Sequence, residues 1–212
     1  MANKYNFKQA KFFDTVNDLK TLPKQSLREI AIVGRSNAGK STLLNVLTNQ
    51  NRLAYTSKTP GRTQHINYFS LPPSEETFIV DLPGYGYAKV PEKIRTHWIK
   101  LLSEYLEKRI PLIGLVLIMD IRHPLKELDY IMIDFFSRTN KPIHLVLSKA
   151  DKLSKQVQHQ ALAQVKSILK KDGLSNYSIQ LFSGLKKTGA DELETVLTSW
   201  LSNSENLIIN QT

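Results

Sequence analysis

The sequence predicts an α/β protein built on a doubly wound, mostly parallel six-stranded sheet with one antiparallel edge strand. Short apolar runs alternate with longer amphipathic segments along the 212 residues, and this alternation is typical of strand–helix–strand units that wind a parallel sheet. The connection Leu71-Pro72-Pro73-Ser74 has the composition of a hairpin turn, so the two strands that it joins are predicted to be antiparallel. Ligands of such sheets bind beyond the carboxyl ends of the strands. We therefore expect the functional residues in the loops that follow the strands.

The individual elements follow from the length and character of each run. Short, mostly apolar runs predict strands at residues 29–33, 65–71, 77–81, 112–120, 143–148 and 178–182. The amphipathic segments predict helices at residues 40–48, 91–108, 126–138, 155–171 and 190–201. Residues 27–201 thus form one predicted domain, with an N-terminal extension at residues 1–26 and a polar C-terminal tail at residues 202–212. Either end would be disordered or would dock on the domain.

Composition indicates a soluble protein of the cytoplasm. The chain contains no cysteine, which excludes disulfides, thiolate zinc sites and cysteine nucleophiles. Polar residues interrupt the N-terminal segment, so no signal-peptide core forms there, and the most apolar run, residues 110–119, is too short to cross a bilayer. We expect a cytoplasmic monomer that does not contact a membrane.

The charge balance favours a polyanionic partner. Lysine and arginine number 29 against 19 aspartate and glutamate residues, which gives a net charge of +10. Such an excess binds RNA through the release of counterions. Part of the charge would serve a ligand of the protein itself, so the balance alone leaves RNA binding open.

The first chemical motif lies between a predicted strand and a predicted helix. It consists of Gly34, Arg35, Ser36, Asn37, Ala38, Gly39, Lys40 and Ser41. Glycines at this spacing let backbone N–H groups surround a phosphate while the following helix directs its positive end toward it. Lys40 would bridge the β- and γ-phosphates of a nucleoside triphosphate, and the Ser41 hydroxyl would bind Mg²⁺. The motif predicts nucleotide binding, for ATP and GTP alike.

Two further segments fit the γ-phosphate and the metal. Asp81-Leu82-Pro83-Gly84 closes a predicted strand, where the aspartate would hold magnesium through water and the glycine N–H would reach the γ-phosphate. Residues 56–64 have the composition of a segment that becomes ordered around these groups. Thr63 and Thr59 are both candidates for a second hydroxyl on the metal, because their spacing does not decide between them.

The base is predicted from a tetrad at the end of another strand. Ser148-Lys149-Ala150-Asp151 resembles the Asn/Thr-Lys-x-Asp sequence that binds guanine in GTPases. A carboxylate at Asp151 accepts hydrogen bonds from N1–H and from the N2 amino group of guanine, and adenine presents neither donor. Lys149 would lie along the base, and the Ser148 hydroxyl would connect this loop to the phosphate loop with less reach than an asparagine. Backbone N–H groups that would meet the guanine O6 follow the last strand, at Phe182, Ser183 and Gly184.

With these motifs in order, the sequence is similar to the EngB family of bacterial ribosome-assembly GTPases. Besides the phosphate loop and the guanine tetrad, the matching stretches are Thr59-Pro60-Gly61-Arg62-Thr63-Gln64, Asp81-Leu82-Pro83-Gly84-Tyr85-Gly86-Tyr87-Ala88 and Phe182-Ser183-Gly184-Leu185-Lys186-Lys187-Thr188-Gly189. They span nearly the whole chain, and the last two are far more specific than a general GTPase motif. Gly184 departs from the second serine that is common there, a change that a backbone contact tolerates.

The resemblance implies a P-loop GTPase domain at residues 27–201 that binds GTP and GDP with Mg²⁺. It assigns the metal to Ser41 and Thr63, which decides against Thr59. The matching residues that it adds to the nucleotide site are Gly61, Arg62 and Gln64. It also implies a cytoplasmic protein that is needed for assembly of the large ribosomal subunit and whose loss disturbs cell division and septation.

GTP hydrolysis is expected to be slow. Ras-like enzymes place a glutamine after Asp-x-x-Gly to orient the attacking water, but Tyr85 occupies that position, and a phenol does not align water as an amide does. Asn37 resembles the asparagine that helps to hold K⁺ in related GTPases, so potassium-assisted hydrolysis is expected, with Lys40 and Asn37 as catalytic residues. Alternatively, Asn37 only caps the loop. Arg35 and Arg62 would supply positive charge or else face solvent or RNA.

Three functions compete. The first is a switch on the maturing large ribosomal subunit, with ribosomal RNA contacted by Lys166, Lys170, Lys171, Lys186 and Lys187 unless these side chains are only solvated. The second is a nucleotide-dependent interaction protein in septation that does not bind ribosomes directly. The third is an ATP-dependent kinase, which the guanine tetrad opposes. The five histidines lack the spacing of metal ligands, and we expect them to be ordinary surface or core residues.

Overall fold

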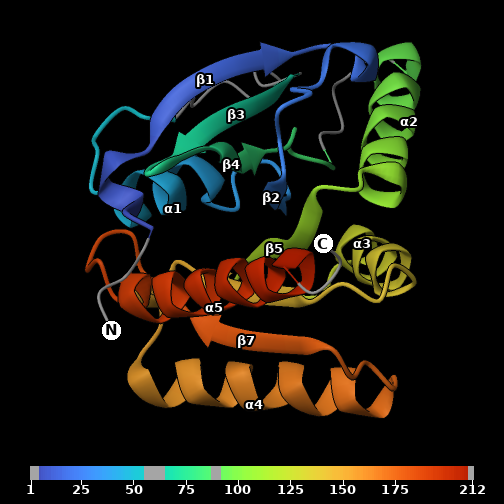
Figure 1. The fold of residues 1–212 in the computed structure, drawn as a ribbon. Helices are drawn as coiled ribbons and strands as arrows, with labels where there is room; N and C mark the ends of the chain where they lie inside the picture. The colour runs from blue at the N-terminus through green and yellow to red at the C-terminus, as the bar shows by residue number, and fades with distance from the viewer. Residues whose placement is uncertain (1–4, 55–64, 87–91, 210–212) are drawn as a thin grey trace.

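A computed structural model describes residues 5–54, 65–86 and 92–209 of the chain. Its strands are β1 (Lys11–Val16), β2 (Arg28–Gly34), β3 (Ile66–Leu71), β4 (Ser74–Asp81), β5 (Leu112–Asp120), β6 (Ile143–Ser148) and β7 (Tyr177–Leu181). Its helices are α1 (Lys40–Leu47), α2 (Glu92–Lys108), α3 (Glu127–Ser137), α4 (Lys155–Lys171) and α5 (Ala190–Ile209). Every predicted strand and helix is present, so the predicted α/β class is confirmed (Figure 1).

The described strands form one sheet in the order β1-β3-β4-β2-β5-β6-β7. β3 pairs antiparallel with β4 and with β1, and the pairs from β4 to β7 are parallel. The reversed strand is therefore the one predicted from the hairpin connection. The parallel strands β2, β4, β5, β6 and β7 end at the same edge of the sheet, which places the loops after them together.

The sheet contains seven strands in the described part of the chain, and the prediction of six was wrong. The seventh strand, β1, comes from the segment predicted as an N-terminal extension, and it covers β3, which is thus not the edge strand. In β1 only Val16 is buried, and a bulge lies between Phe12 and Asp14. An exposed, charged and bulged strand is typical of a sheet edge. Because it buries so little, it lacks the apolar pattern that marks the other strands.

Both faces of the sheet are covered by helices, which explains why its central strands β2, β5 and β6 are buried and mostly apolar. In β2, Ile30 and Ile32 join one core cluster, whereas Ala31 and Val33 join the other, as the pleat of a strand requires. The first cluster packs under α1 and α5 through Leu43, Leu44, Leu47, Leu193, Leu197 and Leu201. The second packs under α2, α3 and α4 through Leu101, Leu102, Tyr105, Leu106, Ile133, Phe136, Val165 and Leu169. Each buried leucine contributes about 1.5–3 kcal/mol to this packing.

The two chain ends are more structured than the sequence suggested. Tyr5 and Phe7 are buried in the core cluster under α1 and α5, so the N-terminal segment docks on the domain. α5 continues to Ile209, and residues 202–209 are therefore helical rather than a tail. α5 lies close to the sheet because β5 has a glycine beneath it: a Cβ at Gly114 would lie 2.6 Å from the Trp200 ring.

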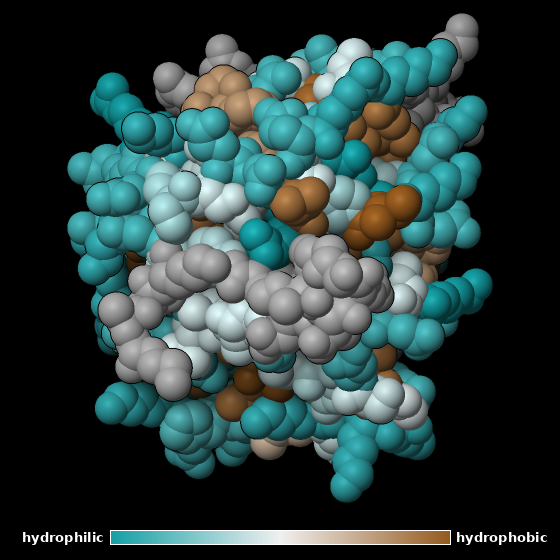
Figure 2. Space-filling model, viewed as in Figure 1, coloured by the Kyte–Doolittle hydropathy of each residue, from teal (hydrophilic) through white to brown (hydrophobic). Residues whose placement is uncertain are grey.

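The surface is mostly hydrophilic on the face shown in Figure 2, where hydrophobic residues are scattered. None of the helices in the described residues is both long enough and apolar enough to span a bilayer.

Candidate functional site

The loop from Gly34 to Ser41 leaves β2 and leads directly into α1. Gly34 ends β2 at a point where a Cβ would lie 2.6 Å from the Ile118 carbonyl oxygen of β5, so this position requires glycine. Asn37 and Gly39 have positive φ angles of 62° and 104°, which turn the chain into the helix. No described side chain caps the first turn of α1. Its first backbone N–H groups are therefore available to an anion.

Lys40 and Asp81 connect the phosphate loop to the end of β4. The Lys40 ammonium forms an ion pair with the Asp81 carboxylate, and only 10% and 4% of the two side chains are exposed. Asp81 reaches the loop because it is the last residue of β4, which pairs in parallel with β2. Ser41, next to Lys40, is half-buried. The Lys40 ammonium and the Asp81 carboxylate thus meet at this edge of the sheet.

Backbone contacts join residues 84–86 to the phosphate loop. The Ser36 N–H donates to the Tyr85 carbonyl oxygen at 2.9 Å, and the Tyr85 N–H donates to the Gly34 carbonyl oxygen at 3.3 Å. These bonds form a short parallel bridge between Arg35 and Tyr85. A Cβ at Gly84 would lie 3.4 Å from the Ser36 nitrogen. Gly84, predicted to contact a γ-phosphate, therefore lies against the phosphate loop.

The Tyr85 hydroxyl contacts α3. It donates a 2.7 Å hydrogen bond to Asp129 Oδ1, and Asp129 Oδ2 accepts the Lys126 N–H at 2.9 Å. Burial, reinforced by the Asp129 charge, raises the pKa of Tyr85 well above its usual range. Burial also raises the pKa of Asp129, against the lowering effect of the Tyr85 hydrogen bond. The phenol is thus a neutral donor fixed on α3, and the sequence did not reveal this partner because it lies 44 residues away.

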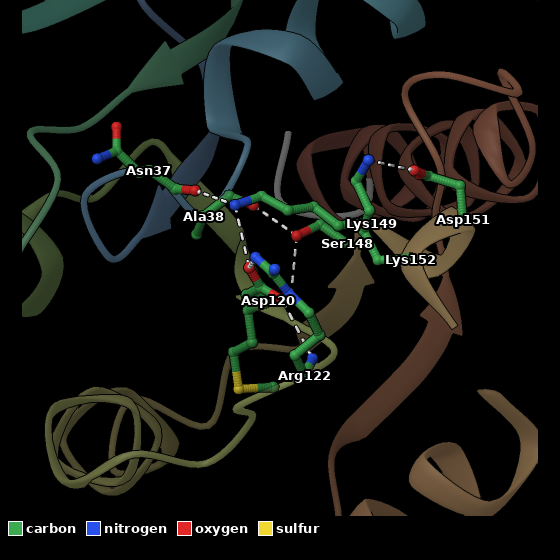
Figure 3. Close-up of polar contacts among 9 residues, drawn as sticks. Asn37, Ala38, Asp120, Arg122, Ser148, Lys149, Asp151 and Lys152 are labelled. Atoms are coloured by element: carbon green, nitrogen blue, oxygen red, sulfur yellow. Dashed lines mark hydrogen bonds and ion pairs between the residues drawn. The ribbon is translucent and has the colours of Figure 1, made fainter. Parts of the chain in front are cut away.

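Two side chains at the end of β6, those of Ser148 and Lys149, reach the phosphate loop (Figure 3). The Ser148 hydroxyl lies 2.5 Å from the Ala38 carbonyl oxygen and 3.0 Å from that of Met119. A serine at this position therefore makes the connection expected of it. The Lys149 ammonium donates to the Asn37 carbonyl oxygen at 2.7 Å. Both contacts bind the guanine tetrad to the backbone of the phosphate loop.

The Asp151 carboxylate is held in place by Ser183. Ser183 Oγ donates to Asp151 Oδ1 at 2.6 Å and accepts the Lys186 N–H at 3.1 Å. The Ser183 hydrogen bond keeps the pKa of Asp151 below its usual value, and Lys152 Nζ lies 3.7 Å from Oδ2. Asp151 is therefore an ionised acceptor in a fixed orientation. The Ser183 side chain positions it, whereas the sequence predicted a role only for the Ser183 backbone N–H.

Of the three backbone N–H groups predicted to meet the guanine O6, two have acceptors within the protein. The Phe182 N–H donates to the Leu147 carbonyl oxygen at 2.9 Å, and the Ser183 N–H donates to that of Thr188 at 3.1 Å. The Gly184 N–H has no acceptor among the described residues. Gly184 lies close to α1, where a Cβ would be 2.3 Å from Thr42 Cγ2. Gly184 is thus the donor of this set that remains available.

Most of the predicted base residues line one cavity, with Ala150 and Ser183 as the exceptions. It has a volume of about 220 Å³ and lies between α1 and the loops after β6 and β7, bounded by Gly39, Thr42, Ser148, Lys149, Asp151, Lys152, Phe182, Gly184 and Leu185. A larger hollow of about 350 Å³ lies between α3 and α4, next to Lys141, Ile143 and Asn176. No predicted site residue borders that larger hollow. The smaller cavity is the functional candidate, because it joins the phosphate loop to the guanine tetrad.

A buried hydrogen-bond chain supports the loop between β7 and α5. His144 Nδ1 lies 2.7 Å from Ser178 Oγ, and His144 Nε2 lies 2.8 Å from Gln180 Oε1. Gln180 Nε2 donates to the Gly189 carbonyl oxygen at 2.6 Å. Gly189 has a φ of 84°, and a Cβ there would lie 2.3 Å from the Leu181 carbonyl oxygen. His144 is thus a core residue, as expected, but one that fixes the loop that carries Ser183 and Gly184.

Some predicted residues lie outside the described part of the chain. These are Thr59, Gly61, Arg62, Thr63, Gln64, Tyr87 and Ala88. The assignment of Thr63 to the metal therefore stays a prediction. Leu82, Pro83, Ala38 and Ala150 are described, and all four are buried.

Comparisons with known proteins agree with this geometry. A family model described as "50S ribosome-binding GTPase" matches residues 29–149. The "Probable GTP-binding protein EngB" of Neisseria meningitidis serogroup B is 60% identical over 200 residues, which cover 94% of each chain. The crystal structure of "a probable GTP-binding protein engB" has a TM-score of 0.64 at 22% identity, covering 82% of this chain and 99% of that chain. The structure of Era in complex with MgGDPNP and nucleotides 1506–1542 of 16S ribosomal RNA has a TM-score of 0.65 at 25% identity, covering 82% of this chain and 57% of that one.

Proposed function

The chain belongs to the EngB family of GTP-binding proteins and is a GTPase, and we propose that it is a slow, nucleotide-dependent switch in assembly of the large ribosomal subunit. Three observations support the ribosomal role. The matching family model is described as a 50S ribosome-binding GTPase, a neighbour in fold binds ribosomal RNA, and the net charge of +10 favours a polyanionic partner. Normal cell division would depend on this role, in a cytoplasmic monomer.

The phosphates would bind at the loop that joins β2 to α1. Backbone N–H groups of the loop and of the first turn of α1 would surround the β-phosphate. Lys40 would bridge the β- and γ-phosphates, exchanging its ion pair with Asp81 for the nucleotide. The Gly84 N–H, which lies against the same loop, would reach the γ-phosphate.

Magnesium fits the oxygen donors at this point. The Ser41 hydroxyl and the Asp81 carboxylate are hard ligands of the kind that Mg²⁺ prefers, and the ion pair between Asp81 and Lys40 places the carboxylate at the phosphate loop. Ser41 and Thr63 would hold the ion directly and Asp81 through water. Bound there, Mg²⁺ would neutralise charge on the phosphates.

Guanine recognition rests on the Asp151 carboxylate, which carries the proposal. It borders the 220 Å³ cavity and is held ionised by Ser183 at 2.6 Å. Asp151 would accept hydrogen bonds from N1–H and the N2 amino group, while the Gly184 N–H would donate to O6. Lys149 would lie along the base, because its ammonium is fixed at the Asn37 carbonyl oxygen.

Replacement of Asp151 tests this assignment. In the Asp151→Asn variant the amide presents a donor where guanine also has donors, so GTP affinity is expected to fall by roughly 10⁴-fold, and xanthosine triphosphate should become the preferred ligand. Titration of labelled GTP, XTP and ATP measures the change. Asp134→Asn, which alters an exposed aspartate on α3, is the control. Unchanged GTP binding by Asp151→Asn would contradict the assignment of the base site.

A septation switch that acts without direct ribosome binding remains the alternative function. It uses the same nucleotide site but predicts a protein partner. The two functions differ in whether the protein binds the large subunit when GTP is present.

A further inference from the structure

A charged cluster at the end of β5 lies behind the guanine tetrad. The Asp120 carboxylate is 3.0 Å from Lys149 Nζ. Arg122 binds the same carboxylate in a bidentate manner. Its Nε donates to Oδ1 at 3.0 Å, and a terminal nitrogen donates to Oδ2 at 2.6 Å. Figure 3 shows Lys149 extended between the phosphate loop and Asp120. The Lys149 ammonium is therefore shared between the Asn37 carbonyl and the Asp120 carboxylate.

Lys149 combines an unusual backbone conformation with a partly exposed side chain. Its φ is 58°, in the left-handed region that non-glycine residues seldom adopt. Its side chain is 31% exposed, so packing alone does not fix a long, flexible chain of this kind. The two oxygen partners at its end determine where the aliphatic stem lies.

Arg122 in turn fixes Asp120. Besides the two guanidinium contacts, the Arg122 N–H donates to Asp120 Oδ1 at 3.1 Å, so the carboxylate cannot rotate without losing several bonds. Partial burial raises the pKa of Asp120, but the hydrogen bonds from Arg122 and then Lys149 outweigh it and hold that pKa well below the usual value. The anchor is therefore negatively charged at neutral pH.

We propose that Asp120 is a positioning residue for guanine-nucleotide binding, which acts through Lys149 and is itself held by Arg122. The proposal rests on the proposed function, because it takes Lys149 to lie along the base. Asp120 does not border the cavity and is assigned no contact with the nucleotide. Its effect should be confined to the affinity of the nucleotide, with no effect on hydrolysis once the nucleotide is bound.

A double-mutant cycle tests the proposal. Asp120→Asn keeps the size of the side chain but removes the charge that holds Lys149, and it should weaken GTP and GDP binding roughly tenfold, within the range of couplings between contacting residues. In a Lys149→Met background the same substitution should change affinity by less than about twofold, since no ammonium remains to position. The turnover of Asp120→Asn at saturating GTP should equal that of the unsubstituted protein. Fluorescent-nucleotide titration and single-turnover hydrolysis measure these quantities.

Two further variants serve as controls. Arg122→Gln changes an exposed residue and should weaken nucleotide binding by roughly threefold, as expected for a partly exposed ion pair. If Asp120→Asn folds poorly, this variant still tests whether the anchoring of Asp120 affects nucleotide affinity. Asp134→Asn breaks a comparable aspartate–arginine pair on α3 and should leave nucleotide affinity unchanged.

The possible results separate this inference from the proposed function. An equal loss from Asp120→Asn with and without Lys149 would overturn the proposal, because it would show a general structural effect. Tighter binding by Asp120→Asn would also overturn it, since the carboxylate would then compete with the nucleotide for Lys149. If Asp151→Asn did not change base preference, the assignment of the guanine site would be contradicted, and the present inference would lose its basis.

Discussion

Tyr85 and Asn37 both lie at the phosphate loop, and within the described part of the chain only the Tyr85 side chain has a hydrogen-bond partner. The Tyr85 hydroxyl donates its hydrogen bond to Asp129 at 2.7 Å, so it is not directed at an attacking water. Asn37 is exposed, and in Figure 3 its side chain points away from Lys149, which contacts only its carbonyl oxygen. We therefore expect a cation bound near Asn37, rather than the Tyr85 hydroxyl, to supply positive charge in the transition state.

GTP turnover is accordingly expected to be faster in KCl than in NaCl. One well-placed charge or donor in a transition state is worth about 10²–10³ in rate, so the stimulation should be at least roughly tenfold and should disappear in Asn37→Ala. Tyr85→Phe is the control and should keep the same hydrolysis rate at saturating GTP, because the phenol does not act on water. Phosphate release in the two salts measures the rates. Equal turnover in both salts, with and without ribosomal subunits, would rule out the potassium route.

At the scale of elements, the loop between β7 and α5 depends on a buried histidine. His144 is 1% exposed, and burial lowers its pKa despite the opposing hydrogen bond with Gln180. The neutral ring has a partner at each nitrogen, and its chain of contacts ends at Gly189, in the loop that carries the predicted guanine contacts of Ser183 and Gly184. The folded protein therefore favours the neutral ring.

This preference predicts a pH-dependent stability. In the unfolded chain the imidazole takes up a proton as the pH falls below about 6.5. In the folded protein the buried ring is protonated only at a lower pH. The contribution of His144 is therefore complete well above that pH and is lost progressively as the pH falls through about 6.5 toward the lower pKa of the folded protein. Chemical denaturation across this range should show a shallower decline for His144→Asn than for the unsubstituted protein. His159→Asn, at an exposed histidine, is the control. A decline in His144→Asn as steep as in the unsubstituted protein would contradict the account.

At the scale of the whole molecule, the predictable features are those that leave a local pattern. β2, β5 and β6 are buried on both faces and each contains a run of apolar residues, and the phosphate loop is a contiguous motif. β1 escaped prediction because it buries only Val16. The pairs that complete the site, Tyr85 with Asp129 and Ser183 with Asp151, join residues 44 and 32 positions apart. Nothing in the local sequence specifies such partners, since folding alone brings them together.

The central claim, a nucleotide-dependent switch on the large ribosomal subunit, is tested most directly by co-sedimentation. With a non-hydrolysable GTP analogue the protein should sediment with large subunits or their precursors, and with GDP it should remain in the supernatant. Binding in the presence of the analogue should weaken as salt is raised, because the positively charged protein would displace counterions from RNA. Equal sedimentation in the two nucleotide states, or none in either at low salt, would contradict the account.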